Sequence, residues 1–429
     1  MVGRVGRWLN HPIDATILDL FRSGLGLVLA LAAARQVAYG WVDRLYLQPH
    51  YHFAWVSWAV VPSPAVLYAL FGLMGATGLV LAASPFVGRW GARLYRPAVL
   101  LHLLAFGYVE LLDKALYLNH YVLVTLLLLV LAVLPAPGRG ARRWSLWLLR
   151  AQFALVWFWA GFCKLNSDWM VRGEPLASWL GARTDLPMVG TLFELHETAL
   201  LMSWGGAAYD LTITGWLLWG RTRRAAAVVA TVFHVVIWTL FPIGIFPWLM
   251  LLGVLLFFDH PTAAHPPDHE PVAGPPLGTV GVVAWVASVV VVASIPARFV
   301  FLPGPVLWTE AGYRFAWRVM LTEKTGHVSY TAIERGTDRR WVLRPTDELE
   351  PWQHEQMRTQ PDMIAQYGRH LAEELAAQGH DVAIYADAWA SLNGRKAQRL
   401  LRPDVDLTQP DAALWAQEWV VELEEPLRW

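Results

Sequence analysis

The sequence predicts a polytopic α-helical membrane protein of about nine spans, with a small mixed α/β domain at its C-terminal end. Of the 429 residues, 56% are hydrophobic and only 16% are charged, unlike the composition of a soluble protein. Apolar runs long enough to cross about 30 Å of hydrocarbon recur along residues 1–301. Such runs stop after that point, so we expect a transmembrane domain over 1–301 and a second domain over 302–429.

Nine apolar segments are the expected membrane spans, and polar residues, proline or glycine separate them. They are residues 15–40, 64–83, 97–112, 121–134, 144–164, 198–220, 225–241, 248–258 and 278–301. The eighth segment is short enough to form a re-entrant helix in place of a span. The longest loops are expected at 166–196 and 259–276.

Arginine clusters predict the orientation of these spans. Two arginines precede the first span, and further clusters at 89–96, 139–143 and 221–224 follow the second, fourth and sixth spans. In a nine-span topology all of these clusters lie on one side, which the positive-inside rule assigns to the cytoplasm. We therefore expect a cytoplasmic N-terminus and, because the count is odd, an extracytoplasmic domain over 302–429.

Charge and cysteine content exclude several kinds of protein. The net charge is zero, so there is no electrostatic basis for binding nucleic acid, and we expect no such partner. The single cysteine, Cys163, excludes an internal disulfide. Residues 1–14 carry two arginines but no apolar core, so we expect no cleavable signal peptide.

The C-terminal domain has a mixed pattern. Alternating apolar residues in 327–333 and 340–344 predict a β-hairpin, and 382–385 and 388–392 are typical of two strands. Apolar residues at helical spacing predict one helix over 351–377. The final stretch is acidic and rich in tryptophan.

Polar side chains on several spans converge on one outer-leaflet region of this topology. They are Asp113, Lys114, Asn119, His120, Lys164, Asp210 and His234. Ionisable groups in a bilayer are costly and are often functional, so a common site is one interpretation. The alternative is that these groups join helices, and that Lys164 extends its amine to the lipid headgroups.

Individual members of this group also have structural interpretations. Asp113 and Lys114 would neutralise each other at the membrane boundary, and Asn119 would cap the fourth span. His120 and His234 are metal-type ligands, but no third ligand has a diagnostic spacing, so we predict no metal site.

A buried lysine suits base catalysis. Burial favours the neutral amine over the ammonium, so Lys164 could take a proton from a weakly acidic phenol in an apolar pocket. A membrane hydroquinone partitions into lipid, and aromatic side chains near the site, such as Trp157, would stack on its ring. Spacing alone names neither the quinone nor the reaction.

Several motifs resemble those of one family. The segment F-W-A-G-F-C-K-L-N-S-D-W at 158–169 resembles the Y-F-x-A-G-x-x-K-L-x-x-D-W signature of vitamin K-dependent gamma-carboxylases and their bacterial HTTM-domain relatives. L-L-D-K followed by N-H, and F-H followed by L-F-P-I-G-I-F, are similar to two further motifs. The likeness continues in the C-terminal domain, in G-Y-R-F-A-W-R-V-M, D-M-I-A-Q-Y, I-Y-A-D-A-W-A-S-L-N-G-R and P-D-V-D.

The resemblance implies an activity and roles for particular residues. Lys164 would deprotonate vitamin K hydroquinone (menaquinol or phylloquinol), and O2 would convert the product into a strong base that ends as the epoxide. That base would remove a γ-proton from a peptide glutamate, to which CO2 adds. His120 would serve the carboxylation step as a second catalytic residue. The implied quinol-binding residues are Asn119, His234, Trp157 and Asp113, and the implied substrate-binding residues are Tyr313, Trp317 and Met320.

The resemblance also implies partners and a location. The partners would be the lipid bilayer, a quinol and a glutamate-containing peptide or protein, and the location would be a bacterial inner membrane. Arg318 stands where the animal enzymes carry an acid, and the chain lacks their further lumenal portion, so propeptide-directed processive carboxylation is not expected. Two alternatives stay open: a quinone-dependent membrane oxidoreductase that makes epoxide without carboxylation, and a non-catalytic membrane binding protein.

Overall fold

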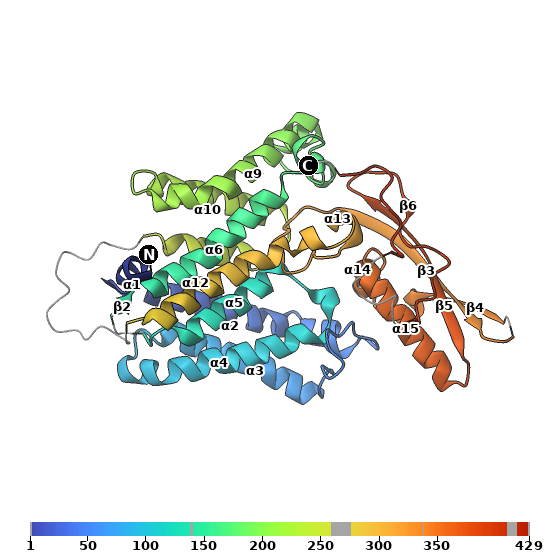
Figure 1. The fold of residues 1–429 in the computed structure, drawn as a ribbon, viewed down its shortest axis with the longest axis horizontal. Coiled ribbons are helices and arrows are strands. Elements are labelled where there is room, and N and C mark those ends of the chain that lie inside the picture. The colour runs from blue at the N-terminus through green and yellow to red at the C-terminus, as the bar shows by residue number, and fades with distance from the viewer. Residues whose placement is uncertain (1, 138–139, 259–275, 338, 410–417, 428–429) are drawn as a thin grey trace.

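The computed structural model describes residues 2–137, 140–258, 276–337, 339–409 and 418–427. A bundle of helices from the first 300 residues lies beside a C-terminal α/β domain (Figure 1). Each predicted apolar segment corresponds to a helix: α2 (Thr16–Ala38), α3 (Pro64–Ala83), α4 (Gly88–Leu112), α5 (Asn119–Val133), α6 (Arg143–Cys163), α9 (His196–Leu218), α10 (Arg223–Leu240), α11 (Phe246–Leu255) and α12 (Thr279–Ser294), which continues as η4 (Ile295–Phe301).

Six of these helices are long and apolar enough to cross a membrane, within the described residues: α2, α3, α4, α6, α10 and α12 with η4. The predicted class of polytopic helical membrane protein is therefore confirmed, but the count of nine spans is not. At 1.5 Å per residue, α5 and α11 reach only about 22 and 15 Å. The helix α9 has 23 residues but carries a buried carboxylate at Asp210.

Several elements were not predicted from the sequence. The chain begins with the helix α1 (Val2–Leu9) and the strand β1 (Pro12–Ile13), which pairs with β2 (Ala141–Arg142). The predicted loop at 166–196 contains α7 (Ser167–Met170), α8 (Leu176–Gly181) and η3 (Gly190–Glu194). Two further turns are η1 (Asp43–Leu47) and η2 (Lys114–Leu116). Of the other predicted loop, 259–276, all but the last residue lies outside the described residues.

Small residues set the spacing of the first two long helices. A Cβ atom added to Gly26 in α2 would lie 2.4 Å from the backbone nitrogen of Ala82, and one added to Gly78 in α3 would lie 2.8 Å from that of Ala30. Each helix therefore carries a glycine and an alanine four residues apart at the contact. This is the small-residue pattern that lets membrane helices pack closely.

The C-terminal domain is built on a four-stranded antiparallel sheet in the order β4-β3-β5-β6. The strands are β3 (Lys324–Glu334), β4 (Arg340–Leu343), β5 (Val382–Leu392) and β6 (Gln398–Arg399), so the predicted hairpin is confirmed. The two strands predicted around Asp387 are one strand, because alternate residues of β5 face the core without a break.

Two helices pack beside this sheet where the sequence predicted one. They are α14 (Pro351–Met357) and α15 (Pro361–Ala377), and the domain also contains α13 (Val306–Thr309) and η5 (Pro345–Asp347). Pro361 explains the interruption, because a proline disfavours helical backbone at the preceding residue, here Gln360. In Figure 1 the sheet, α14 and α15 lie at one end of the bundle.

Buried ion pairs join the two parts of the molecule. Asp168 in α7 accepts hydrogen bonds of 2.6 and 2.7 Å from the guanidinium of Arg395 and one of 2.9 Å from Asn393. These residues belong to the K-L-N-S-D-W and S-L-N-G-R motifs, so two motifs far apart in sequence meet at this junction. Breaking such a pair leaves an uncompensated buried charge, which typically costs about 3–5 kcal/mol.

Candidate active site

A small cavity lies among α6, α9, α10 and α11 and contains the signature lysine. We call it the lysine cavity; its volume is about 80 Å³. Its lining is largely aromatic and apolar, with three ionisable side chains, those of Lys164, Asp210 and His234. The ring-bearing and sulfur-bearing members of the lining are Trp157, Trp169, Phe233, Phe241, Phe246, Met202, Met250 and Met320.

Lys164 forms a buried ion pair in this cavity. Its Nζ atom lies 2.9 Å from Oδ2 of Asp210 and donates a second hydrogen bond of 3.2 Å to the carbonyl of Ala160. The ammonium also lies 5.1 Å from the centre of the Trp169 ring, within cation–π range. The amine is thus directed into the protein, which excludes the predicted alternative of an amine extended to the headgroups.

Gly161 explains why the two charges meet. A Cβ atom at this position would lie 2.9 Å from the backbone nitrogen of Leu211 and 3.0 Å from Cβ of Asp210. The absence of a side chain therefore lets α6 and α9 touch one turn before Lys164. This close approach brings the carboxylate of Asp210 to the end of α6.

His234 also lines the lysine cavity. Its Nε2 atom is 3.3 Å from the hydroxyl of Tyr209, and its Nδ1 atom has no hydrogen-bond partner among the described residues. The Tyr209 ring stacks on Phe233 at 4.0 Å between centroids, which fixes the tyrosine against α10. An imidazole with one unpaired nitrogen at an aromatic wall can exchange a hydrogen bond with a bound polar group.

A second, larger cavity of about 640 Å³ lies between the bundle and the C-terminal domain. We call it the arginine cavity because Arg35, Arg314 and Arg318 line it together with Lys114. Its lining also includes Tyr117, Asn119, His120, Glu310, Tyr313 and Met320.

Two of the arginines in this cavity, Arg35 and Arg318, form no ion pair with the described residues. Arg314 and Lys114 both pair with Asp362, at 2.8 and 3.3 Å. By contrast, Nε and Nη2 of buried Arg318, and Nε of Arg35, have no hydrogen-bond partner among the described residues. Buried guanidinium groups without an anion are costly, so this cavity is suited to binding a carboxylate.

Charge in the surrounding C-terminal domain also bears on the cavity. Burial disfavours ionisation of Asp362, but Arg314 and Lys114 outweigh this effect and lower the pKa of the carboxyl to about 2. Burial raises the pKa of Glu310, against the opposing influence of Lys324, whose Nζ atom lies 3.4 Å away. Asp362 is therefore ionised at neutral pH and holds the two cations in place.

The two cavities share a wall, formed by Phe241, Phe246, Val319 and Met320. The ring of Phe246 separates two of the predicted histidines, because its centroid lies 6.2 Å from that of His120 and 6.1 Å from that of His234. On this geometry His120 faces one cavity and His234 faces the other.

The segment that supplies part of this wall has an unusual backbone. Glu310, Phe315, Trp317 and Met320 all have positive φ angles, between 54° and 62°. Each such conformation costs about 1–3 kcal/mol in a residue other than glycine and persists only where the surroundings enforce it. Strain of this kind clusters at functional sites, and here it fixes the backbone that carries Arg318.

The structure divides the predicted site residues into three groups. Lys164, His234 and Trp157 line the lysine cavity, and Asn119, His120 and Tyr313 line the arginine cavity, while Met320 lines both. Asp113 and Trp317 line neither cavity. The polar groups that were predicted to converge on one site are thus divided between two adjacent cavities, with Asp113 outside both.

Asp113 and Trp317 have structural contacts instead. Asp113 accepts hydrogen bonds from the backbone of Ala115 and from Gln353 of α14, both at 2.9 Å. Trp317 is buried in the hydrophobic core of the bundle. Asn119 supports its cavity by donating a hydrogen bond of 3.3 Å to the backbone carbonyl of Arg318.

Sequence reasoning assigned no role to three residues that the geometry makes prominent. Asp210 was visible in the sequence as a carboxylate in a predicted span. Because Lys164 is a basic residue in another predicted span, an ion pair between the two could have been proposed. Arg35 near the end of the first span was a similar signal. Arg318 was recognised only as a departure from the animal enzymes, because nothing in the local sequence shows that its side chain is buried and that two of its nitrogens lack a hydrogen bond to the described residues.

These observations define a class of protein: a helical integral membrane protein with a buried ion pair in an apolar cavity and an α/β domain that closes a second, cationic cavity. The chain belongs to the vitamin K-dependent gamma-carboxylase family. Residues 10–261 match the HTTM domain, and residues 278–426 match the lumenal domain of the vitamin K-dependent gamma-carboxylase. No solved structure matches the chain.

The family match confirms the resemblance drawn from the motifs. It identifies a carboxylase-like membrane protein, of a family that uses vitamin K hydroquinone. The lumenal-domain match begins at residue 278 and so includes α12. The boundary expected after residue 301 stays a prediction.

Proposed function

We propose that this protein is an integral membrane enzyme that uses reduced vitamin K, O2 and CO2 to carboxylate glutamate side chains of a peptide or protein. The observation that carries the proposal is the Lys164–Asp210 ion pair, which is buried in an aromatic cavity and separated from a cationic cavity by one layer of side chains. One cavity suits a phenol, and the other suits a carboxylate.

Asp210 is proposed to make Lys164 available as a base. An ion pair as such holds the lysine protonated, and a protonated amine cannot accept a proton. In a low-dielectric cavity, transfer of one proton from Nζ to Oδ2 across 2.9 Å gives two neutral groups and removes both buried charges. The neutral amine can then take a proton from a phenol held against it.

The residues of the lysine cavity fit a quinol in their chemistry. Trp157, Phe233 and Phe246 offer ring faces, and Lys164 and His234 offer polar atoms. When bound, reduced vitamin K supplies, together with O2, the strong base that takes a proton from the γ-carbon of glutamate. At about 80 Å³ the cavity is small for such a ring, so we propose that the flexible side chain of Met320 moves aside to admit it.

The arginine cavity is proposed to hold the glutamate. Arg318 and Arg35 would bind its carboxylate, and Tyr313 and Met320 would contact the methylene groups. His120 would lie beside the γ-carbon, where an imidazole can exchange a proton, and Asn119 would position Arg318. The shared wall would then place the γ-carbon within reach of the lysine cavity.

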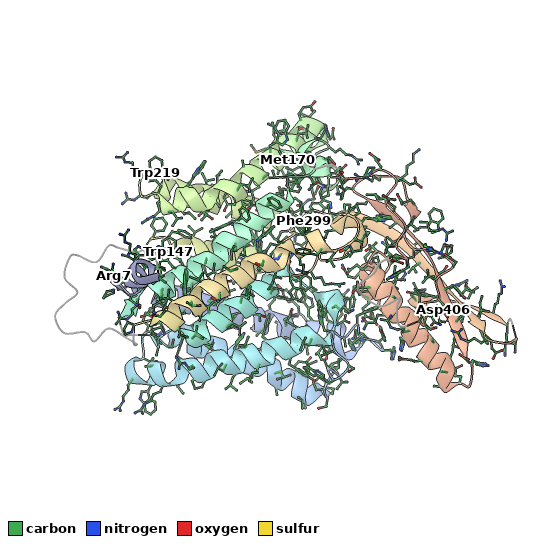
Figure 2. All side chains as sticks on the ribbon, viewed as in Figure 1. Arg7, Trp147, Met170, Trp219, Phe299 and Asp406 are labelled. Carbon is green, nitrogen blue, oxygen red and sulfur yellow. The ribbon has the colours of Figure 1, made fainter. Side chains whose placement is uncertain are left out.

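We also propose that the bundle end nearest the C-terminal domain is extracytoplasmic. Arg7, and Trp219 just before the arginines of 221–224, lie at the other end of the bundle (Figure 2). Arginine clusters mark the cytoplasmic side, so this arrangement supports a cytoplasmic N-terminus. The location we propose is a bacterial inner membrane. The domains would divide after residue 301.

A quinol epoxidase without carboxylation is a second candidate. The wall of Phe241, Phe246, Val319 and Met320 favours it, because chemistry in the lysine cavity could proceed with the arginine cavity empty. In this case Arg318, which replaces the acid of the animal enzymes, would serve another anion.

One assay distinguishes these functions. Detergent-purified protein is incubated with phylloquinol or menaquinol, O2, a short glutamate-containing peptide and labelled bicarbonate. Epoxide together with peptide-bound label is the expected result. Epoxide without label would favour the epoxidase, and neither product with either quinol would leave a non-catalytic membrane binding protein.

A further inference from the structure

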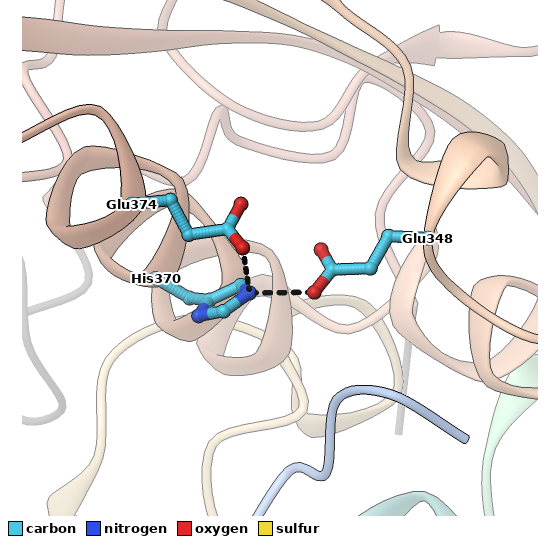
Figure 3. A group of neighbouring side chains, drawn as sticks. All are labelled: Glu348, His370 and Glu374. Carbon is cyan, nitrogen blue, oxygen red and sulfur yellow. Dashed lines mark hydrogen bonds and ion pairs between the residues drawn. The ribbon is translucent and has the colours of Figure 1, made fainter. Parts of the chain in front are cut away.

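Three metal-type side chains converge in the C-terminal domain, away from both cavities. His370 and Glu374 lie one turn apart on α15, and Glu348 follows η5. The Nε2 atom of His370 lies 2.8 Å from Oε1 of Glu348 and 3.7 Å from Oε1 of Glu374 (Figure 3). One ligand atom from each residue lies within 4.8 Å of the other two.

A proton alone does not satisfy this arrangement. Both carboxylates are directed at the same ring nitrogen (Figure 3), and that nitrogen can carry only one proton. Glu348 is at hydrogen-bond distance, but Glu374 at 3.7 Å is not. A divalent cation at the same position would be bound by all three groups.

The chain contains a natural comparison for this cluster. Nδ1 of His380 lies 2.8 Å from Oε1 of Glu334, the same distance as in the His370–Glu348 pair. The second oxygen of Glu334 accepts a hydrogen bond from Thr337, and no second carboxylate joins this pair among the described residues. The His380–Glu334 pair is therefore an ordinary ion pair and a matched control.

Neighbouring side chains hold the three residues of the cluster in place, as residues around a metal site hold the side chains that bind the metal. The hydroxyl of Tyr367 donates a hydrogen bond of 2.8 Å to the other oxygen of Glu348. The ring of Tyr51 packs on His370 with centroids 4.2 Å apart, and Gln353 donates to the Tyr51 carbonyl at 2.7 Å. Tyr51 belongs to the loop between η1 and α3, so the cluster lies where the bundle meets the C-terminal domain.

The local charge favours a cation. Two carboxylates, those of Glu348 and Glu374, lie within 4 Å of one imidazole nitrogen of His370. Glu373 adds a further carboxylate near His370, and His50 is the other ionisable group near Glu348. Two carboxylates at one imidazole give the cluster an excess of acidic ligands, which a divalent cation would balance.

We propose that Glu348, His370 and Glu374 bind a divalent metal ion of the Zn²⁺ class. One imidazole and two carboxylates form a ligand set that Zn²⁺ accepts, with water at the fourth position. Ligand atoms around a tetrahedral Zn²⁺ lie about 3.4 Å apart, given bonds of about 2.1 Å. The separations of 2.8 and 3.7 Å bracket this value, and the two carboxylate oxygens lie within 4.8 Å of each other, so the ligand atoms need to shift by no more than about 1.4 Å relative to one another. Through Tyr51 the ion would strengthen the contact between the two parts of the molecule.

The test is metal binding by the full-length protein in detergent. Protein treated with a chelator is titrated with Zn²⁺ by calorimetry at pH 7.5, and the thermal unfolding temperature is followed in parallel. One Zn²⁺ per chain is expected, with a higher unfolding temperature. Glu374→Gln removes a half-exposed ligand and keeps the His370–Glu348 pair, so it should fold and bind Zn²⁺ at least about ten-fold more weakly.

The control variant is His380→Gln, which should bind Zn²⁺ as the wild type does. The proposal is overturned if the wild type binds no Zn²⁺, if Glu374→Gln and His370→Gln bind it unchanged, or if His380→Gln loses it equally. Binding of Ca²⁺ in place of Zn²⁺ would overturn the assignment of metal class. The result does not depend on carboxylase activity, so the two proposals stand or fall separately.

Discussion

At the scale of single residues, the account depends on side chains whose partners are unusual. Lys164 and Asp210 place two charges in an apolar cavity, and Arg318 lines the other cavity with two guanidinium nitrogens that have no hydrogen-bond partner among the described residues. Structures tolerate such groups poorly unless they pair with a neighbour or a ligand. Each residue therefore gives a direct prediction.

Asp210→Asn should abolish quinol oxidation although Lys164 is retained. The amide can neither accept a proton from Nζ nor hold the lysine by an ion pair, so the lysine loses its proton acceptor and its orientation, and we expect at least a 100-fold lower rate of epoxide formation. The measurement is the rate at saturating quinol. Unchanged epoxide formation in a folded Asp210→Asn protein would show that the carboxylate has no part in the reaction.

Arg318→Gln should weaken binding of the peptide more than it slows the reaction. A hydrogen bond to a charged group contributes about 1.5–3 kcal/mol, so the KM for peptide should rise about ten-fold to a hundred-fold while the KM for quinol stays the same. Arg402→Gln is the control, because its ion pair with Asp404 is exposed. A rise in the KM for quinol alone would show that Arg318 contributes to quinol binding and not to peptide binding, and would contradict the prediction.

At the scale of helices and loops, the site depends on close approach. Gly161 lets α6 touch α9, and the strained segment 310–320 supplies one wall of each cavity. The contact between Asp362 and its two cations then holds that segment against η2 and α15.

Gly161→Val should separate Lys164 from Asp210. The new side chain would meet backbone atoms of α9 at about 3 Å, so the helices must move apart, at a typical cost of 1–3 kcal/mol. We expect at least ten-fold slower epoxide formation and a lower unfolding temperature. Gly205→Val is the matched control, because nothing lies within 4 Å of that position on α9. Equal effects of the two variants would refute the close-approach argument.

Acid should loosen the contact at Asp362. Its pKa in the folded protein, about 2, lies below the ordinary 3.8, so the ionised carboxylate stabilises the fold above about pH 4. This contribution, about 2 kcal/mol, is lost as the pH falls from 4 towards 2. Unfolding temperatures of wild type and Asp362→Asn should therefore differ at pH 6 and converge near pH 2. Parallel pH profiles would contradict this role.

At the scale of the whole molecule, the sequence predicted the class of fold and the location of the helices. Hydrophobic periods depend on local residues, so each apolar segment was found, as was the hairpin. The number of spans was not recovered, because α5 and α11 are apolar but short and α9, although long, is not among the six candidate spans. The sequence predicted two strands around Asp387 where the structure has the single strand β5, because burial of alternate residues continues along the whole strand. It also predicted one helix where the structure has α14 and α15, because the helical spacing of apolar residues does not show the break that Pro361 introduces.

The site was recovered in part for a related reason. Motif residues such as Lys164, His120 and His234 carry a local signature, so the sequence identified them. Their division between two cavities depends on Phe246 and Met320, which no pattern distinguishes from core residues. Asp168 and Arg395 also belong to motifs, yet they join the two parts of the molecule. Membership of a motif therefore does not by itself separate chemistry from assembly.

The measurement that tests the central claim most directly compares Lys164→Ala with Lys396→Ala, an exposed lysine of the C-terminal domain. Epoxide formation and peptide-bound label are followed together in detergent-purified protein of equal folded fraction. The account predicts that Lys396→Ala makes both products at the wild-type rate, and that Lys164→Ala makes neither. If Lys164→Ala makes epoxide at the wild-type rate, the buried lysine is not the base, and the ion pair with Asp210 serves only to join α6 and α9.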